Sequence, residues 1–315
     1  MQRYVSVLSV ATLVSLAACS DTLEPGNASD QDRQEITAIL DESGWFTDAF
    51  GDDGAVADFS LGTSFDFGFL RADAQVEVPL VRFWGRRHRE PVSRERRVEI
   101  TDNVAEVVWV VTFEGAFVLD RTADDVRNPT SKPLQHQAIQ HARFVRRDAP
   151  DDRGRNWRLA GISAREWRMT DPEKRTVDLA RIEVFVNDVS QLVVEEPLRI
   201  LDVDQGRIPR LEIGDVVRVV ASVVNESELG NTPPEFVFLH LFHGNPNARG
   251  WIRVRMPPND AGDYVREWTV RQAGRGRIIV DAIDSQAFAT DEDDDYRANL
   301  VGIPYRIGQD ADRSR

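Results

Sequence analysis

The sequence predicts an α+β domain followed by an all-β domain, and two observations carry this prediction. Residues 32–45 place apolar side chains near helical spacing, with Ile36 and Leu40 four positions apart. From residue 82 onward, apolar runs alternate with Gly, Pro, Asn and Asp turns, which is typical of strands. The chain has 315 residues, and this length favours two domains of ordinary size.

The first predicted domain covers residues 32–170. Asp30 or Asp32 can cap its helix, because a carboxylate accepts hydrogen bonds from the first free backbone N–H groups. The order of the later elements predicts an antiparallel meander that begins with a hairpin around the Asp102-Asn103 turn. The predicted strands are residues 96–100, 105–119, 134–147 and 157–167. The pattern of residues 55–80 favours neither a helix nor a strand.

The second predicted domain covers residues 179–309 and follows a polar linker at residues 171–178. Residues 310–315 are predicted to be a disordered tail. Seven short strands with turn residues between them indicate a β-sandwich. They are residues 181–186, 215–224, 235–242, 251–256, 264–270, 277–283 and 300–307.

Two family resemblances refine these domains. The helix followed by a meander that ends in Trp157-Arg158-Leu159 resembles the nuclear transport factor two-like family, which includes the SnoaL-like proteins. This resemblance implies a curved sheet wrapped on helices as a cone with an apolar pocket, in a family of enzymes and non-catalytic binders. The phrases GDVVRVVASVVNES and NDAGDYVREWTV resemble bacterial immunoglobulin-like domains of envelope proteins, which implies contact with a protein partner.

The N-terminus indicates export. Arg3 is followed by an uncharged stretch, residues 4–18, which is shorter than the about 20 residues that cross a bilayer core as a helix. We therefore expect residues 1–18 to be a secretory signal peptide. Its end, Leu16-Ala17-Ala18-Cys19, resembles the lipobox of bacterial lipoproteins.

The lipobox resemblance implies cleavage before Cys19, diacylation of its thiol and acylation (palmitate among the acyl groups) of the new amino group. Several acyl chains make a stable anchor, whereas one gives marginal binding. Cys19 is the single cysteine of the chain. Ser20 stands at the next position, where the resemblance implies sorting to the outer membrane in a Gram-negative host. Residues 19–31 are expected to form the lipidated start and a flexible tether.

The charge of the chain argues against nucleic acid as a partner. It carries 53 acidic and 39 basic residues, a net charge of −14, whereas nucleic-acid binding needs a basic face. Residues 82–97 are a local exception, with seven Arg and two Glu. We expect either a solvated edge strand rich in arginine or a contact patch for anionic head groups or an acidic partner.

Three residues are candidates for a ligand pocket in the first domain. Trp109 and Phe113 share one face of a predicted strand, and His136 lies on the next strand. The alternative is that these side chains simply form the core. His136 and His141 are five positions apart, as His240 and His243 are three apart. Odd spacing places each pair on opposite strand faces, so neither pair is expected to bind a metal.

Other chemical signatures are weak. The sequence has no HExxH, GxSxG or P-loop motif, and no cofactor is expected. The acidic run at residues 291–297 offers oxygen ligands for calcium, with Asp291, Asp293 and Asp295 as candidates, but it lacks the glycine and spacing of an EF-hand. Asp202, Asp204 and Gly206 give a second incomplete match. Plain acidic loops are the expected alternative.

The sequence therefore predicts a membrane-tethered envelope protein that binds or assembles rather than catalyses, with an envelope protein as partner. The alternative is an enzyme that uses a carboxylate or histidine as acid or base on a small apolar molecule. A third option is dimerisation through the open sheet face of the first domain. A pocket lined by Trp109 with a buried, unpaired acid or base would favour the enzyme.

Overall fold

The computed structural model describes residues 30–46, 81, 83–88, 91–122, 126, 128–203, 205–227, 235–242, 251–271, 274–290 and 296–308. Strands make up 62% of these residues. Two α-helices lie among them, α1 (Asp30–Ser43) and the short α3 (Gln286–Ala289), with one 3-10 turn, η2 (Pro172–Lys174). The predicted α+β class of the first domain is therefore wrong, because one helix does not form a helical layer.

Each predicted strand is present and most are longer than predicted, but β1, β7, β8 and β9 were not predicted. In the first part they are β1 (Phe83–His88), β2 (Ser93–Thr101), β3 (Val104–Asp120), β4 (Thr130–Arg146) and β5 (Trp157–Met169). In the second part they are β6 (Val177–Val186), β7 (Val189–Val194), β8 (Ile200–Asp202), β9 (Arg210–Leu211), β10 (Val216–Asn225), β11 (Glu235–Phe242), β12 (Trp251–Met256), β13 (Tyr264–Thr269), β14 (Gly274–Asp284) and β15 (Ala298–Ile307). The predicted turn at Asp102 is confirmed by its positive φ of 53° between β2 and β3.

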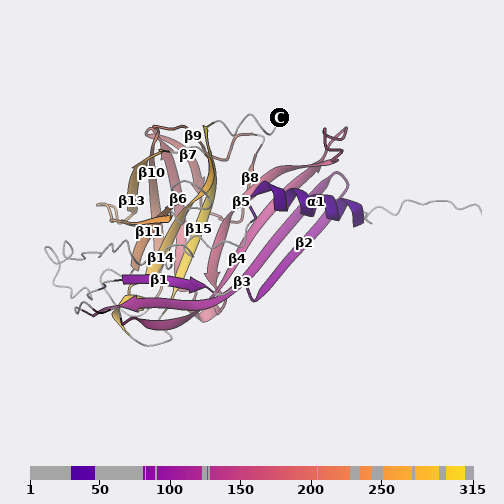
Figure 1. The fold of residues 1–315 in the computed structure, drawn as a ribbon. Helices are drawn as coiled ribbons and strands as arrows, with labels where there is room; N and C mark the ends of the chain where they lie inside the picture. Colours follow the sequence, from indigo (N-terminus) through magenta and orange to yellow (C-terminus); the bar gives the residue numbers. More distant parts are fainter. Residues whose placement is uncertain are drawn as a thin grey trace, which may run out of the picture.

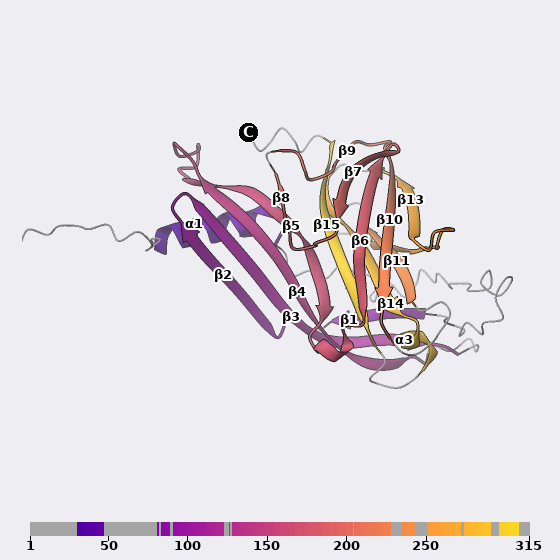
Figure 2. The ribbon, with the colours of Figure 1, turned by 180° about the vertical axis from the view of Figure 1, so that it is seen from behind.

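One large sheet joins both parts of the chain (Figures 1 and 2). Its strand order is β1-β3-β4-β5-β15-β14-β11-β12, and β2, β8 and β9 pair in addition with β3, β5 and β15, respectively. The junction is the antiparallel pairing of β5 with β15, from Arg168 opposite Asn299 to Arg165 opposite Gly302. The second part is therefore not a self-contained immunoglobulin-like sandwich, because its strands continue the sheet of the first part across the predicted linker.

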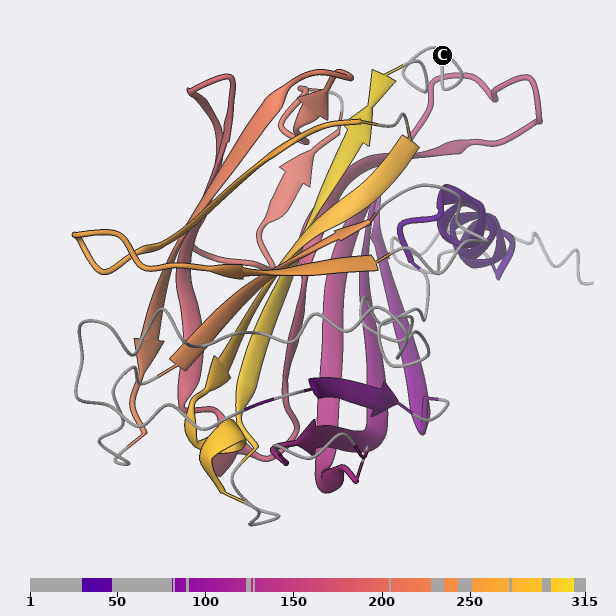
Figure 3. The same cartoon turned by 60° about the vertical axis from the view of Figure 1, so that its left-hand side comes forward.

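The large sheet curls into a half-barrel (Figure 3). β3 and β4 are 17 residues long, and the register of β4 against β5 shifts at two places, next to Gln140 and Arg143. Such bulges increase the local twist and bend a sheet. The concave face buries aromatic side chains from both parts, among them Trp84, Phe117, Trp167, Phe238 and Phe288.

A second sheet covers the convex side. It has four strands in the order β13-β10-β6-β7. β14 shows how the two cores share one strand: Ile278 and Val280 belong to the core between the sheets, whereas Ile279 and Ile283 belong to the concave core. Because successive side chains of a strand point to opposite faces, β14 is buried on both sides.

Helix α1 lies across one end of the half-barrel, as Figure 1 shows. It buries Ile36 and Leu40 against the sheet. Asp32 accepts hydrogen bonds from Trp157 Nε1 (2.8 Å) and from Arg146 Nη2 (2.8 Å). Glu35 accepts one from the backbone N–H of Trp157 (2.7 Å). These carboxylates fix the helix to the ends of β4 and β5.

Gly302 permits the close approach of β15 to the concave core. A Cβ atom at this position would lie 2.8 Å from Trp167 Cζ3 and 3.0 Å from Trp167 Cη2. The indole ring of Trp167 is rigid, and the side chains around it are closely packed. The absence of a side chain at Gly302 therefore lets Trp167 lie directly on the strand.

We predict that Gly302→Ala destabilises the protein by about 1–3 kcal/mol, the usual cost of overpacking a core. The free energy of unfolding, measured by urea titration of the wild type and the variant, would give this cost. In the Trp167→Phe background the cost should shrink, because phenylalanine lacks the second indole ring that carries the two clashing atoms. An equal cost in both backgrounds would contradict this explanation.

Candidate functional site

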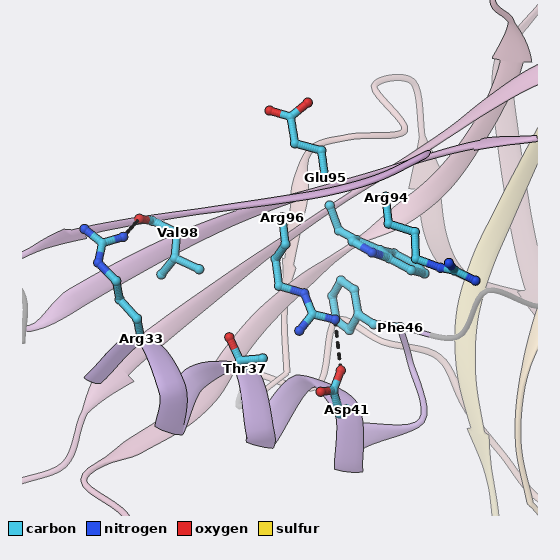
Figure 4. A pocket seen from close by; sticks show the side chains of 9 residues that line it. Arg33, Thr37, Asp41, Phe46, Arg94, Glu95, Arg96 and Val98 are labelled. Atoms are coloured by element: carbon cyan, nitrogen blue, oxygen red, sulfur yellow. Dashed lines mark hydrogen bonds and ion pairs between the residues drawn. The ribbon is translucent and has the colours of Figure 1, made fainter. Parts of the chain in front are cut away.

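An open pocket of about 550 Å³ lies between helix α1 and strand β2, and Figure 4 shows it from close by. We call it the helix pocket. The residues that line it are Arg33, Thr37, Asp41, Phe46, Arg94, Glu95, Arg96, Val98 and Trp109. The helix supplies one wall, β2 the other, and the start of the segment after the helix supplies Phe46.

The alternation of β2 decides which of its side chains face the pocket. Arg96 and Val98 point toward the helix in Figure 4, and the guanidinium of Arg94 is turned to the side, whereas the carboxylate of Glu95 points away from the helix. The register places Arg96 opposite Trp109 of β3, and directly opposed residues share a sheet face. The strand thus presents two guanidinium groups beside an indole.

The inner part of the helix pocket is aromatic and rigidly supported. The rings of Phe46 and Trp109 meet edge to face at 5.7 Å, and the two residues are only 7% and 3% exposed. Below them, the guanidinium of Arg165 lies 4.3 Å from the Trp109 ring. Arg165 donates hydrogen bonds to Gln140 Oε1 (2.9 Å) and to the carbonyl of Trp45 (3.2 Å). These contacts hold the indole in place.

Among the described residues that line the helix pocket, three are arginines and two are acids, Asp41 and Glu95. Arg33, on the helix, donates a hydrogen bond to the backbone carbonyl of Val98 across the pocket. Arg96 Nη2 donates to Asp41 Oδ1 at 2.9 Å. Figure 4 shows Arg96 directed at Asp41, whereas the guanidinium groups of Arg33 and Arg94 lie apart from this pair. Each guanidinium has five N–H donors, so these two bonds use only part of the donor capacity of Arg33 and Arg96.

A second polar group, which we call the buried charge cluster, lies in the concave core. It comprises Arg86, Asp281, His240, Tyr296 and His136, each at most 1% exposed. Arg86 donates two hydrogen bonds to Asp281, of 2.6 and 2.8 Å, and a third to Tyr296 Oη of 2.5 Å. His240 Nε2 lies 2.9 Å from Asp281 Oδ2, and His136 Nε2 lies 3.4 Å from Tyr296 Oη.

The charge state of Asp281 follows from these neighbours. Burial has the largest effect and by itself would raise the pKa of the carboxyl. The positive charge of Arg86 and the hydrogen bonds from His240 and Arg86 outweigh it and hold the pKa of Asp281 below its ordinary value of 3.8. Asp281 is therefore a firmly ionised partner in a bidentate ion pair, the strongest geometry available to arginine and a carboxylate.

The structure separates the three residues predicted to bind a ligand. Trp109 lines the helix pocket. Phe113 and His136 are directly opposite each other on β3 and β4, and they are only 2% and 0% exposed. His136 belongs to the buried charge cluster, and Phe113 is part of the concave core. Hence only Trp109 of the three lines the helix pocket.

Other sequence predictions have clear outcomes on the described residues. His136 and His141 lie on opposite faces of β4, as predicted. His136 is buried opposite Phe113 of the concave core, whereas His141 is only partly buried and is opposite Val108 on the other face. No group of three or more His, Cys, Asp or Glu suited to a metal occurs within the part of the chain that the structure describes. Cys19, His243, Asp204 and the calcium candidates Asp291, Asp293 and Asp295 lie outside the described residues.

The arginine-rich stretch at residues 82–97 divides into three environments. Arg86 is fully buried in the concave core, whereas Arg94 and Arg96 face the helix pocket (Figure 4). Arg97 points outward and pairs with Glu95 at 3.1 Å, both side chains being 64% exposed. The expectation of a solvated edge strand thus describes only part of β2. Composition could not separate these roles, because they depend on strand alternation and on distant partners.

Comparisons with protein-family models, with curated proteins and with solved structures give no match for this chain. Neither helix in the described ranges has the length and apolar character needed to cross a bilayer. The helix pocket and the buried charge cluster are therefore the features that bear on function.

We predict that Asp281→Asn destabilises the protein by about 3–5 kcal/mol at neutral pH, because it leaves the buried Arg86 without its counter-charge. Since the folded pKa of Asp281 lies below 3.8, the ionised pair stabilises the protein above that pH. This stabilisation is lost as the pH falls from 3.8 through the folded pKa.

Unfolding free energies measured in urea between neutral and acidic pH would check this prediction. The difference between the wild type and Asp281→Asn should narrow below pH 3.8. The double variant Arg86→Met, Asp281→Leu serves as the control, since removing both charges should cost less than removing one. A constant difference at all pH values would contradict the ionised pair.

Proposed function

We propose that this chain is a membrane-tethered, non-catalytic binding protein whose ligand occupies the helix pocket. The observation that carries the proposal is the pocket itself: an aromatic floor of Phe46 and Trp109 beneath walls that present Arg33, Arg94 and Arg96. Concave sites with apolar linings and a few convergent polar groups are the usual form of small-molecule sites.

The distribution of acid and base groups favours binding over catalysis. An arginine stays protonated and cannot accept a proton at ordinary pH, so the three guanidinium groups of the pocket can orient an anion but cannot act as a general base. Asp41, the carboxylate beside them, is paired with Arg96. The histidines His136 and His240 belong to the buried charge cluster in the concave core.

The tether in this proposal is the lipidated Cys19. Its support is the Leu16-Ala17-Ala18-Cys19 sequence after a short apolar stretch. Eleven residue steps separate Cys19 from the start of α1 at Asp30. At about 3.3–3.6 Å per extended residue, this tether reaches roughly 40 Å, so the helix pocket would operate close to the envelope membrane.

We predict that Thr37→Phe abolishes ligand binding without unfolding the protein. Thr37 points from α1 into the pocket (Figure 4), so a larger side chain there occupies the space of the ligand. The measurement is fluorescence titration of a chain beginning at Asp21 with two naphthyl probes, the anionic anilinonaphthalene sulfonate and the neutral phenylnaphthylamine.

The matched control is Ala38→Phe, which adds a comparable side chain at the next, exposed position of the same helix. It should bind like the wild type. Binding of at least one probe that is lost only in Thr37→Phe supports the pocket as the ligand site. If neither probe binds, or if both variants bind as the wild type does, the proposed function is wrong.

A second prediction concerns the anchor. A fatty-acid analogue supplied to cells that express the full chain should label the protein and should not label Cys19→Ser. The wild type should also partition into detergent, because acyl chains add about 0.8 kcal/mol of membrane affinity per buried methylene group. Equal labelling of the two proteins would rule out lipidation at Cys19.

A further inference from the structure

We infer that Glu235 and Asp284 form a proton-binding site between the two sheets, and that the bound proton holds one end of the second sheet on the large sheet. The site is separate from the helix pocket, and its test does not depend on the proposed function. The consequence is a joint between the sheets that is tighter in acidic than in alkaline solution.

The two carboxylates lie side by side at one end of the core between the sheets. Glu235 is the first residue of β11 and Asp284 is the last residue of β14, and the register places them directly opposite each other. Opposed residues share one face of a sheet, with Cβ atoms about 4.5–5.5 Å apart. On β11 this is the face of Val237, which belongs to the core between the sheets. The two acids are only 5% and 0% exposed.

Hydrogen-bond donors from the second sheet reach both carboxylates. Tyr264 of β13 donates from Oη to Glu235 Oε1 at 2.9 Å, and Asn225 of β10 donates from Nδ2 to Asp284 Oδ2 at 3.3 Å. β13 is a terminal strand of the second sheet, and β10 is the next strand. These two hydrogen bonds therefore connect one side of the second sheet with β11 and β14 of the large sheet.

No positive charge compensates Glu235 within the part of the chain that the structure describes. The side chains that act on its carboxyl are Tyr264, Asn225 and Asp284. Arg255 of β12 acts on the hydroxyl of Tyr264 instead. Like charges that lie close together in a buried place disfavour each other's ionised form. A proton is the smallest group that can relieve the pair.

The oxygen Oε2 of Glu235 is the atom that would carry this proton. It is buried and has no hydrogen-bond partner among the described residues. A buried oxygen without a donor bears the cost of its lost hydration, and this cost is larger when the oxygen is charged. A proton on Oε2 removes the charge and leaves Oε1 as the acceptor for Tyr264. Burial and the charge of Glu235 raise the pKa of Tyr264, so its hydroxyl remains a donor.

The pKa of Glu235 agrees with this geometry. Burial has the largest effect and raises the pKa above its ordinary value of 4.5, and the charge of Asp284 raises it further. The hydrogen bonds from Tyr264 and Asn225 lower the pKa but do not outweigh burial. Because the pKa is higher in the folded protein, the stabilisation is complete below pH 4.5 and is lost as the pH rises through the folded pKa.

Ionisation of Glu235 therefore puts strain on the contact between the sheets. Hydration of the two charges requires that the ends of β10 and β13 separate from β11 and β14, which is a local opening rather than global unfolding. Asp281 shows the opposite arrangement, since its bidentate bond with Arg86 keeps that buried carboxylate ionised. The chain thus contains two buried carboxylate sites with opposite dependence on pH.

Amide hydrogen exchange of the full chain, corrected for the intrinsic effect of pH, tests the joint between about pH 8 and pH 4.5. In the wild type, exchange in β13 should slow as the pH falls, by about tenfold for each unit by which the folded pKa of Glu235 exceeds 4.5. In Glu235→Gln, exchange should be slow throughout, because glutamine is neutral and its oxygen still accepts from Tyr264. The matched control is Glu267→Gln, an exposed position of the same strand, which should behave as the wild type.

Two further variants should move the transition in opposite directions. Tyr264→Phe removes a hydrogen bond that lowers the pKa of Glu235, so the midpoint should shift to higher pH. Asp284→Asn removes a charge that raises this pKa, so the midpoint should shift to lower pH. A purely structural role would weaken the contact in both variants without such opposed shifts. NMR titration of protein with labelled glutamate carboxyls follows Glu235 directly.

The outcomes decide between a proton site and a simple packing contact. An NMR pKa of Glu235 at or below 4.5 would overturn the proton site. Exchange in β13 with the same pH dependence in the wild type and in Glu235→Gln would overturn the joint between the sheets. If Glu235→Gln does not fold, the NMR titration of the wild type and the shift in Asp284→Asn decide in its place. A raised pKa together with the opposed shifts supports the inference.

Discussion

The ion pair between Arg86 and Asp281 is the constraint on which the shape of the molecule depends. Arg86 lies on β1 and Asp281 on β14, which are five steps apart in the large sheet. At roughly 4.8 Å per strand, a flat sheet would separate them by about 24 Å, farther than the two side chains can span. Their contact at 2.6 Å therefore requires that the sheet curl, and the ion pair joins strands from the two sides of the half-barrel.

The curl also creates the setting of the helix pocket. A concave sheet has an inner face that is open at its ends, and α1 covers one end while the aromatic core and the buried charge cluster fill the rest. Arg165 links the two regions, because it supports Trp109 at 4.3 Å and lies 5.5 Å from the ring of Trp167. The indole at the floor of the pocket is thus connected through Arg165 to the aromatic core.

The sequence was informative about elements and uninformative about their partners. Local strand patterns predicted β3, β4 and β5 and seven of the ten strands of the second part, because each depends on neighbours within a few residues; β7, β8 and β9 were missed. The pairing of β5 with β15 depends on two strand edges about 130 residues apart, and no local pattern records it. The assumption that each half completes its own fold therefore gave the wrong fold class.

For the candidate site, too, the sequence identified single residues but not the contacts between distant ones. Trp109 was found because it shares a strand face with other apolar residues. Arg33 was not found, and Arg96 was identified only as part of the arginine-rich stretch 82–97, because proximity to Trp109 depends on helix packing and on the register of β2 against β3. Arg86 looked solvated within a run of arginines, and only Asp281, 195 positions away, shows why it is buried.

The shared strand β14 affects how this molecule unfolds. Alternate side chains of β14 belong to two different cores. Unfolding of either core therefore removes packing contacts from a strand that the other core also needs. The two cores should therefore lose their structure in one cooperative transition rather than in sequence. At the polar segment between β5 and β6, the chain passes from the large sheet to the second sheet within a single folding unit. The residues before this segment and the residues after it each lack a complete core of their own.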